Sequence, residues 1–567
     1  MTDDMPAHRR VLAGLDPEQL AAVTARSGPV CILAGAGTGK TRSITHRVAH
    51  RVLTGEIHPR HVLAVTFTAR AAAQMRVRLA ALGVGGVQAR TFHAAAMRQV
   101  RYFSARLFAG RELPELVESK VRLVGQAAAG CGVSTDRTAA RDLAAEIEWA
   151  KSSLVEPAEY EAAVGKSARE VPLDAARIAK VYAAYEVAKR RAGLIDFEDL
   201  LRTAVWAIEE HTDIAEQVRS QYRHFVVDEY QDVNPVQQRL LDAWLGGRDD
   251  LTVVGDASQT IYSFTGASSG YLLDFGRRYP GATVVRLVRD YRSTPQVVGC
   301  ANRVISQARG DLARLRLELI GQRPAGPEPD LRAFPDEPAE AAAVAARCAE
   351  LIAAGTSPHE IAVLFRANAQ SERFEEALAG ANVPYVLHGG ERFFNRPEVR
   401  RAIVALRSAT RTTPPGLPLR AAVLSALEAV GWRPEAAPPG GTAREQWEAV
   451  TALVGVAEEL PADRPDLAEG GAGALEAFCA ELGRRAEAQH IPDVAGVTLS
   501  SLHSAKGLEW DVVFVVGLAE GTLPTGYAKT PDAIEEERRL LYVGITRARQ
   551  VLWLSYGQAR AAGGRAR

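Results

Sequence analysis

Residues 28–41 read GPVCILAGAGTGKT, and this stretch decides the fold class. The apolar run at 28–34 has the length of a short buried strand, and it stops at a glycine-rich turn. The segment AGAGTGKT at 34–41 fits the phosphate-loop pattern, in which a glycine-rich loop joins a strand to a helix. Glycines let backbone N–H groups curl around phosphate oxygens at the N-terminus of that helix. The stretch predicts an α/β fold with a nucleotide site.

Within this loop, Lys40 is expected to contact the β- and γ-phosphates, and the Thr41 hydroxyl is expected to bind Mg²⁺. A dinucleotide fingerprint does not fit, because GxGxxG would require glycine at position 40. A glycine-rich turn with a chance Lys-Thr pair is the alternative, and the strand before the loop argues against it. The predicted nucleotide-binding residues of the loop are Ala34, Gly35, Ala36, Gly37, Thr38, Gly39, Lys40 and Thr41.

A second apolar run, HFVVDE at 224–229, ends in two adjacent acids. Charges beside a core are costly unless something offsets them. In phosphate-loop enzymes a strand of this kind ends in an acid that holds the Mg²⁺ shell. We therefore expect Asp228 to bind Mg²⁺ and Glu229 to orient and deprotonate the attacking water. A surface Asp-Glu pair is the alternative interpretation.

Further short runs rich in β-branched residues alternate with helical stretches, which is typical of buried parallel strands. These runs lie at 61–67, 251–256, 282–287, 360–366 and 511–518. Residues 95–195 differ, because they are Ala-rich, charged and mostly helical in period. The segment 408–494 also breaks the pattern, since Pro/Gly-rich stretches separate its helical pieces.

The 567-residue chain is electrically balanced, with 68 Lys+Arg and 68 Asp+Glu. Global charge gives no sign of a nucleic-acid partner, although a local basic groove would suffice. We expect no membrane span, because no run approaches ~18 apolar residues, and the N-terminus lacks the apolar region of a signal peptide. Scattered cysteines without a CxxC pair argue against zinc or disulfides and fit the cytoplasm. They are Cys31, Cys131, Cys300, Cys348 and Cys479.

Nine ordered motifs resemble those of the UvrD/Rep-like superfamily 1A DNA helicases. DEYQDV at 228–233 resembles motif II of that family. The resemblance covers nearly the whole chain except 408–494, and it is nearest to an actinobacterial branch with a shortened 2B domain. The other matching segments are GLDPEQLAAV (14–23), VLAVTFTARAAAQM (62–75), TFH (91–93), VVGDASQTIYSFTGA (253–267), LVRDYRST (287–294), VLFRANAQSERFEEALAGANVPYVLHGGERFF (363–394), VTLSSLHSAKGLEWDVVFVVGL (497–518) and EERRLLYVGITRAR (536–549).

The resemblance implies two RecA-like domains with parallel sheets, ATP in the cleft between them, and a helical subdomain inserted into each. The implied division is 1–94 and 196–288 for domain 1A, 95–195 for helical 1B, 289–407 and 495–567 for domain 2A, and 408–494 for a reduced helical 2B.

Roles for further nucleotide-site residues are also implied by the resemblance. Gln19 would pair with the adenine edge, in the way a carboxamide does in DNA readout, and Tyr291 would stack on the base. Arg42 would lie near the nucleotide, and Glu509 would bond a ribose hydroxyl. Gln259 would touch the γ-phosphate or the attacking water.

Two arginines, Arg292 and Arg547, would act as arginine fingers in the same family pattern. Such cations stabilise transition-state charge and can be worth roughly 10³–10⁵ in rate. A surface ion pair is the alternative for either arginine taken alone.

Binding of single strands without sequence preference needs aromatic platforms and phosphate donors. The candidates from matched motifs are Phe67, Thr91, His93, Phe197, Tyr262, Phe264 and His503. Core packing is the alternative for each aromatic residue. Relatives usually carry Trp-Arg where this chain has Phe264-Thr265, and Thr-Asn-Lys where it has Thr68-Ala69-Arg70. A weaker hold on single strands is therefore expected.

The function implied is a DNA-dependent ATPase and 3′→5′ helicase or translocase that uses ATP and Mg²⁺. The implied partners are single-stranded DNA and 3′-tailed duplex DNA, and no membrane is involved. The chain is expected to be a monomer, and a protein partner is left open. The resemblance also implies the class terms helicase, hydrolase and isomerase, and a role in DNA repair. The alternatives are an ATP-gated DNA-binding scaffold and a motor subunit of a larger helicase complex. A chain that stops soon after motif VI leaves no room for a nuclease domain, and poor unwinding is expected.

Overall fold

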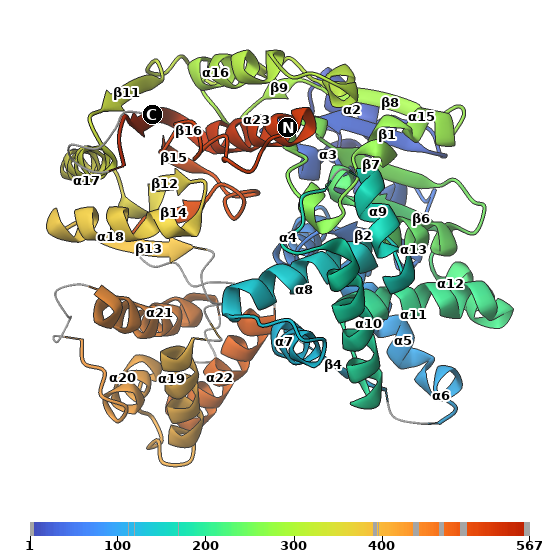
Figure 1. Cartoon of the computed structure of the whole chain (residues 1–567), viewed down its shortest axis with the longest axis horizontal. Helices are drawn as coiled ribbons and strands as arrows, with labels where there is room; N and C mark the ends of the chain where they lie inside the picture. Colours follow the sequence, from blue (N-terminus) through green and yellow to red (C-terminus); the bar gives the residue numbers. More distant parts are fainter. Residues whose placement is uncertain are drawn as a thin grey trace. The chain divides into compact units, whose positions relative to one another are not determined.

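The computed structural model describes residues 5–110, 113–117, 119–167, 169–388, 394, 396–434, 441–463, 470–487 and 496–560. The chain divides into two compact units. Unit 1 comprises Met1–Val288 with Asp311–Leu317, and unit 2 comprises Arg289–Gly310 with Glu318–Arg567. Each unit contains one six-stranded parallel sheet with helices around it and one separate group of helices, as Figure 1 shows.

The sheet of unit 1 has six parallel strands in the order β3-β2-β6-β7-β1-β8. Every residue of β1, β2 and β7 is buried, which explains their continuous apolar sequences. Because parallel strands end at the same edge, the loops after β1, β6 and β7 meet there. The strands are β1 (Val30–Ala34), β2 (Val62–Thr66), β3 (Gln88–Thr91), β6 (His224–Val227), β7 (Leu251–Gly255) and β8 (Thr283–Leu287).

Helices in unit 1 begin at clear N-terminal signals. Asp16 and Asn234 form capping boxes at the starts of α2 and α13, each followed by proline in the first helical turn. The helices of this α/β part are α1 (Ala7–Arg10), α2 (Pro17–Thr24), α3 (Lys40–Leu53), α4 (Ala69–Ala81), α5 (Phe92–Tyr102), α11 (Phe197–Glu210), α12 (Thr212–Gln221), α13 (Pro235–Leu245), α14 (Gly270–Leu273) and α15 (Phe275–Arg278).

A helical group with its own apolar core is inserted between α5 and α11. Its centre is formed by aromatic and aliphatic side chains, among them Ile147, Tyr160, Tyr182 and Tyr185. A two-stranded ladder of β4 (Glu115–Leu116) and β5 (Leu194–Ile195) closes the insertion. The helices are α6 (Ser104–Leu107), α7 (Val121–Gly130), α8 (Arg137–Ser152), α9 (Tyr160–Ser167) and α10 (Ala175–Arg191).

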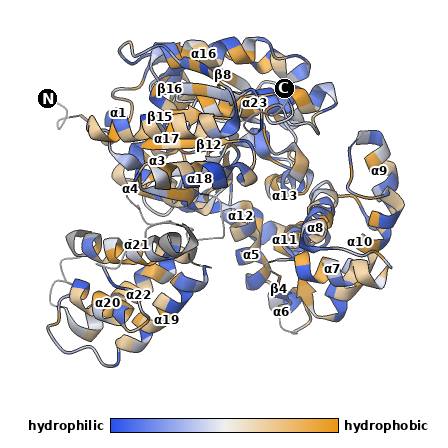
Figure 2. Ribbon diagram, turned by 60° about the vertical axis from the view of Figure 1, so that its left-hand side comes forward, coloured by the Kyte–Doolittle hydropathy of each residue, from blue (hydrophilic) through white to orange (hydrophobic). Residues whose placement is uncertain are grey.

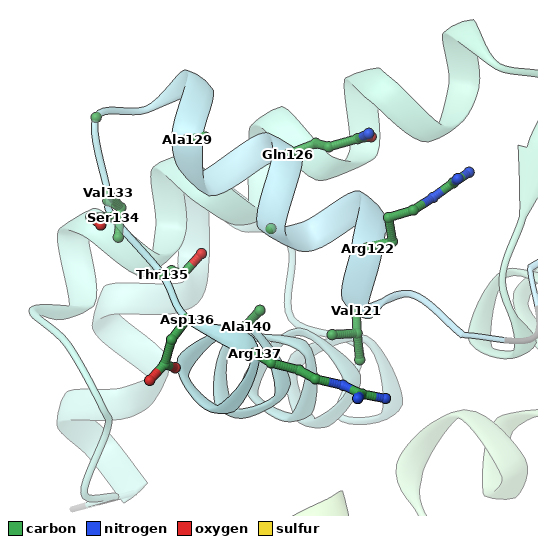
Figure 3. A pocket seen from close by; sticks show the side chains of 12 residues that line it. Val121, Arg122, Gln126, Ala129, Val133, Ser134, Thr135, Asp136, Arg137 and Ala140 are labelled. Atoms are coloured by element: carbon green, nitrogen blue, oxygen red, sulfur yellow. The ribbon is translucent and has the colours of Figure 1, made fainter.

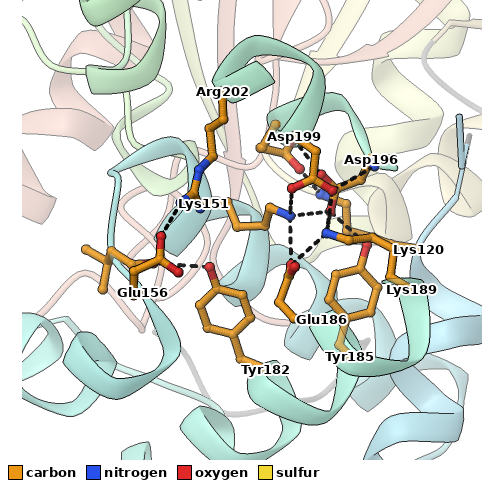
Figure 4. A network of polar contacts seen from close by, with 12 residues as sticks. Lys120, Lys151, Glu156, Tyr182, Tyr185, Glu186, Lys189, Asp196, Asp199 and Arg202 are labelled. Carbon is orange, nitrogen blue, oxygen red and sulfur yellow. Dashed lines mark hydrogen bonds and ion pairs between the residues drawn. The ribbon is translucent and has the colours of Figure 1, made fainter. Parts of the chain in front are cut away.

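A buried ionic network joins α8 and α10 to the start of α11 (Figure 4). The Lys151 ammonium contacts carboxylate oxygens of Glu186, Asp196 and Asp199 at 2.7, 2.8 and 2.5 Å. Lys189 contacts the same three carboxylates. Those carboxylate oxygens lie within 4.8 Å of one another, as metal ligands would, but both ammonium groups already contact all three carboxylates. We therefore interpret the cluster as a structural ion network.

Unit 2 also has a six-stranded parallel sheet, in the order β11-β16-β15-β12-β14-β13. Helix α23 carries the segment that resembles motif VI, and it leads directly into β16. The strands are β11 (Asp330–Phe334), β12 (Ile361–Phe365), β13 (Tyr385–His388), β14 (Val497–Ser501), β15 (Trp510–Val515) and β16 (Ala548–Gly557), with β9 (Arg289–Asp290) and β10 (Ile320–Gly321) as a separate pair. The helices are α16 (Pro295–Ser306), α17 (Glu337–Ala353), α18 (Ser371–Gly380) and α23 (Pro531–Ile545).

The helical group of unit 2 packs around a core of its own. It consists of α19 (Pro397–Ala409), α20 (Leu419–Glu428), α21 (Gly441–Asp463) and α22 (Gly471–Glu487). Figure 2 shows α19, α20 and α22 carrying hydrophobic and hydrophilic residues side by side, as expected of helices with one buried face. Val399, Ala402 and Leu406 place α19 in this core, although the sequence assigns it to the segment before residue 408.

The prediction of an α/β fold with two parallel sheets and inserted helices is confirmed. The six-part division of the chain stays a prediction, and its boundary at 408 lies at the end of α19. In the described residues, no helix combines the length and the apolar composition needed to cross a membrane.

Candidate nucleotide and nucleic-acid sites

The glycine-rich loop after β1 adopts a conformation that needs glycine. Gly37 and Gly39 have φ values of 69° and 83°, in the left-handed region. A Cβ atom on Gly39 would lie 2.8 Å from Nε2 of Gln19, so a side chain here would also displace the Gln19 amide. The Thr38 hydroxyl donates to the Gly35 carbonyl at 2.9 Å and closes the loop. Helix α3 then begins at Lys40, which places Lys40 and Thr41 in its first turn.

Gln19 is buried behind this loop rather than exposed. Its backbone N–H donates to Asp16 at 2.7 Å in the capping box of α2, and its Nε2 donates to the Thr38 carbonyl at 3.1 Å. Arg42 lies on the same side of the loop, where its guanidinium donates to the Gly14 carbonyl at 3.0 Å. The structure therefore ties the segment that precedes β1 to the glycine-rich loop.

The ends of β1 and β6, on either side of β7 in the sheet, bring a lysine and two acids together. The Lys40 ammonium lies 3.9 Å from a carboxylate oxygen of Glu229. Asp228 is buried at the end of β6, and burial raises its pKa to about 7, with the Glu229 charge adding to the effect and Lys40 opposing it. Added positive charge would lower this pKa and so favour the ionised carboxylate of Asp228.

Glu229 sits in a backbone conformation that is rare for residues other than glycine. Its φ is 52°, in the left-handed region. Its N–H donates to Asp228 Oδ1 at 3.0 Å, and its carboxylate accepts from the side-chain amide of Gln231. Strained residues of this kind concentrate at functional sites because surrounding contacts must hold them.

The loop after β7 completes this cluster with Asp256 and Gln259. Gln259 Nε2 donates to Asp256 Oδ2 at 2.7 Å, and both side chains are buried. Burial raises the pKa of Asp256, and the Lys40 charge lowers it. Asp256 is not among the residues predicted from the sequence, although an acid directly after the buried run LTVVG is the same signal that identified Asp228.

The chemistry of these donors fits a divalent cation. Asp228 offers a buried carboxylate, and Thr41 offers a hydroxyl in the first turn of α3, beside the Lys40 charge. Hard cations such as Mg²⁺ prefer oxygen ligands of this type. The arrangement can hold a Mg²⁺-bound phosphate chain against the glycine-rich loop.

The other predicted nucleotide residues belong to unit 2. The Arg292 guanidinium lies 2.5 Å from a Glu509 carboxylate oxygen, and it also donates to the Thr546 carbonyl at 3.4 Å. Arg547 is buried and donates to the backbone carbonyls of Val543 and Leu508 at 2.9 and 3.0 Å. Tyr291 is 45% exposed next to Arg292 in the chain.

Three of the predicted aromatic residues form one continuous row in unit 1. The Phe67 and Tyr262 rings are stacked, with centroids 5.7 Å apart and planes 14° apart. Tyr262 in turn lies 6.1 Å from Phe264. Phe67 and Phe264 are 40% and 46% exposed, so the ends of this row are accessible. Such a row can stack against unpaired bases.

A second group forms where α5 begins. Thr91 caps α5 by accepting from the Ala94 N–H at 3.1 Å. The His93 ring meets the Phe197 ring edge-on at 5.6 Å. Burial, followed by the Lys120 charge, lowers the pKa of His93 to about 4, so its imidazole is neutral at pH 7.

His503 belongs to unit 2 and follows β14. Burial lowers its pKa to about 4, and the charges of Arg366 and Lys506 add to this effect. The aromatic row and the Thr91–His93–Phe197 group therefore lie in unit 1, whereas His503 lies in unit 2.

A hollow in the helical group of unit 1 contains none of the predicted site residues. Its lining comes from α7, the loop after it and the start of α8, as Figure 3 shows. Ala129 and Ala140 line it together with Arg122, Gln126 and Asp136. The candidate chemistry lies instead on the loops at the sheet edge of unit 1.

Comparisons with known proteins cover almost the whole chain. The family model described as the UvrD/REP helicase N-terminal domain matches residues 15–280. The model described as the UvrD-like helicase C-terminal domain matches residues 285–414 and 424–559.

Individual relatives align over the same extent. The ATP-dependent DNA helicase UvrD2 of Mycobacterium tuberculosis (strain ATCC 25618 / H37Rv) is 56% identical over 572 residues, which cover 98% of this chain and 80% of that protein. UvrD1 of the same strain is 32% identical, covering 98% of this chain and 84% of its own. The helicase PcrA of Leuconostoc citreum is 30% identical, covering 97% and 83%.

Proposed function

Because the chain belongs to the UvrD/REP helicase family and is an ATP-dependent DNA helicase, we propose that it couples Mg²⁺-ATP hydrolysis to 3′→5′ movement along single-stranded DNA. The observation that carries this proposal is the cluster at the sheet edge of unit 1. There, Lys40 lies 3.9 Å from Glu229, beside Asp228 and the hydrogen-bonded pair Asp256 and Gln259.

In the proposed chemistry, the glycine-rich loop and Lys40 bind the phosphates of ATP. Thr41 and Asp228 hold Mg²⁺, whose charge neutralises the phosphate oxygens when it is bound. Glu229 orients the attacking water and accepts its proton. Gln259 contacts the γ-phosphate or that water, while Gln19, Arg42, Tyr291 and Glu509 bind the nucleoside.

Arg292 and Arg547 are proposed to stabilise the charge of the transition state. In the structure the Arg547 guanidinium is held by the carbonyls of Val543 and Leu508. The proposed role therefore requires those hydrogen bonds to be exchanged, at least in part, for bonds to phosphate oxygens.

Single-stranded DNA is proposed to stack on the row formed by Phe67, Tyr262 and Phe264, and to contact Thr91, His93, Phe197 and His503. Stacking is worth about 1–3 kcal/mol per base, and phenylalanine offers less surface than the tryptophan usual in relatives. We therefore propose that the chain moves along single strands better than it unwinds duplexes. We also propose a 3′-tailed duplex substrate, a monomeric state, a protein partner, a cytoplasmic location and a role in DNA repair.

The expected class term isomerase is wrong. The family description names helicases and the relatives' names are ATP-dependent DNA helicases, so helicase and hydrolase are the terms that apply. An ATP-gated scaffold, which would bind DNA without turnover, does not agree with the similarity to ATP-dependent DNA helicases. A motor subunit of a larger complex would differ from both by needing a partner for movement.

The steady-state ATPase rate, with and without single-stranded DNA, tests the proposal when Lys40→Ala and Glu229→Gln are compared with the unaltered chain. Both variants should lose hydrolysis. Glu229→Gln should still bind ATP, because it keeps the phosphate contacts and removes only the base, whereas Lys40→Ala should bind ATP more weakly. Substantial turnover by Glu229→Gln would contradict its role as the base.

A further inference from the structure

One fully buried amide bridges the loops that follow β6 and β7. Nε2 of Gln231 donates to the Glu229 carboxylate and to Asp232 Oδ2, the latter at 3.3 Å. Its Oε1 accepts the Asp256 N–H at 3.0 Å. Only the NH₂ group can donate to carboxylates, and only the oxygen can accept from a backbone N–H. The partners therefore determine the orientation of the amide.

Gly255 makes room for this bridge. A Cβ atom at position 255 would lie 2.7 Å from Oε1 of Gln231 and 3.3 Å from its backbone N. It would also lie 3.2 Å from a methyl carbon of Leu272. Any side chain at 255 would therefore displace the Gln231 amide or the backbone that carries it.

The bridge continues from Asp256 toward the aromatic row. Asp256 accepts from the Ser258 N–H at 3.0 Å and from Gln259 Nε2 at 2.7 Å, which fixes the first turn of the loop. The same loop ends at Tyr262 and Phe264, two members of the row. Buried polar networks with satisfied partners are rigid, so a displacement of the residues at one end shifts those at the other end.

We propose that Gln231 is a positioning residue that couples the loop 256–264 to Glu229. When bases stack on Tyr262 and Phe264, the loop holds the Asp256 N–H against Gln231. The Gln231 amide then holds the Glu229 carboxylate where it can accept a proton from water. DNA stimulation of hydrolysis passes through this amide. The inference rests on the proposed function, in particular on Glu229 as the base.

The test compares Gln231→Met with the unaltered chain, because methionine keeps the length of the side chain and removes its hydrogen bonds. Single-stranded DNA should stimulate kcat of the variant at least tenfold less. The basal kcat should fall less than the DNA-stimulated kcat, because DNA adds its effect through the Asp256–Gln231 hydrogen bond. The KM for ATP and the Kd for single-stranded DNA should stay within threefold. A loss of kcat with unchanged binding of both ligands distinguishes positioning from a general loss of structure.

Gly255→Ala should disturb the same Gln231–Asp256 hydrogen bond while leaving the Gln231 side chain itself unchanged. It should lose stimulation in the same way. The double variant should lose no more than threefold beyond either single variant, because both changes remove one interaction. Additive losses would overturn the proposal, since they would mean that two separate contacts are involved.

Gln238→Met is the matched control. Gln238 is also buried, accepts from the Tyr230 hydroxyl at 2.7 Å and donates to Asp242 at 2.8 Å, on helix α13. It should keep normal stimulation. Normal stimulation in Gln231→Met, or an equal loss in Gln238→Met, would overturn the coupling role. Absence of DNA stimulation in the unaltered chain would instead refute the proposed function itself, and the coupling role with it.

Discussion

Among single residues, Asp228 makes folding stability depend on pH. Its folded pKa of about 7 lies above the ordinary value of about 3.9. The folded state therefore favours the protonated acid, and the free energy of unfolding falls as pH rises from about 4 to about 7. Each pH unit in this window is worth up to about 1.4 kcal/mol. The penalty should disappear when Mg²⁺ and nucleotide bind.

Asp228→Asn should therefore raise the melting temperature more at pH 8 than at pH 5, measured with EDTA and without nucleotide. Asparagine removes the carboxylate that burial disfavours, and little of that carboxylate penalty exists at pH 5. Asp249→Asn, at an exposed position of the same unit, should show no such pH dependence. An equal effect of Asp228→Asn at both pH values would contradict the raised pKa.

Arg547→Ala tests the proposed arginine finger. We expect kcat for ATP hydrolysis to fall by roughly 10³, with the KM for ATP changed only a few-fold, because a finger acts mainly on transition-state charge. Arg538→Ala removes an arginine of α23 that pairs with Glu535, and it should leave kcat near normal. Hydrolysis by Arg547→Ala within a few-fold of normal would leave Arg547 with only the structural role of binding the two carbonyls.

Sequence patterns predicted the residues at strand ends better than the contacts between them. Asp228 and Glu229 follow a buried run, and such a position is visible in the sequence. The bridge from Gln231 to Asp256 was not predictable, because it depends on β6 and β7 being neighbours in the sheet. Strand order is a property of the fold and leaves no local pattern.

At the scale of elements, the ionic network around Lys151 holds the inserted helices to α11. Lys151 and Asp196 are both fully buried, and the charges around each stabilise the ionised form. Removing one partner of a buried pair typically costs about 3–5 kcal/mol, because an uncompensated charge is left behind. This network is therefore one attachment of the helical group to the rest of unit 1.

Lys151→Met should accordingly lower the free energy of unfolding by about 3 kcal/mol or more. Arg239→Met is the control, because Arg239 of α13 forms an exposed pair with Glu209 of α11. That change should cost less than about 1 kcal/mol. Denaturant titrations of both variants give the comparison, and equal costs would show that the network adds little to stability.

The strands were predictable as elements, whereas this network was not. Runs such as HFVV and LTVV carry β-branched residues that pack well in a sheet, so their local composition predicts their structure. A lysine in an Ala-rich helix is ordinarily exposed. Lys151 is buried because it pairs with Asp196. The two residues lie 45 positions apart in the chain, so no local sequence pattern predicts their contact.

The inserted helices of unit 2 show the same limit. Pro/Gly-rich stretches marked the breaks within 408–494, but α19 packs into that helical core from before residue 408. Its amphipathic sequence is compatible with packing on a sheet or on other helices. Tertiary contacts decide between these, and they do not appear in the periodicity of one helix.

On the scale of the whole molecule, the central claim is that ATP hydrolysis drives movement along single-stranded DNA in the 3′→5′ direction. The balanced charge of the chain gives no sign of such a partner. The aromatic row in unit 1 and the family membership support it. Movement, rather than DNA binding, separates a motor from an ATP-gated scaffold.

Translocation kinetics test this claim most directly. The chain is bound to single strands of increasing length that carry a fluorophore at the 5′ or the 3′ end, and ATP is added with a trap for released protein. Arrival at the 5′ end should be delayed in proportion to strand length, and Glu229→Gln should abolish the signal. Arrival times independent of length, or a length-dependent delay at the 3′ end instead, would contradict the account.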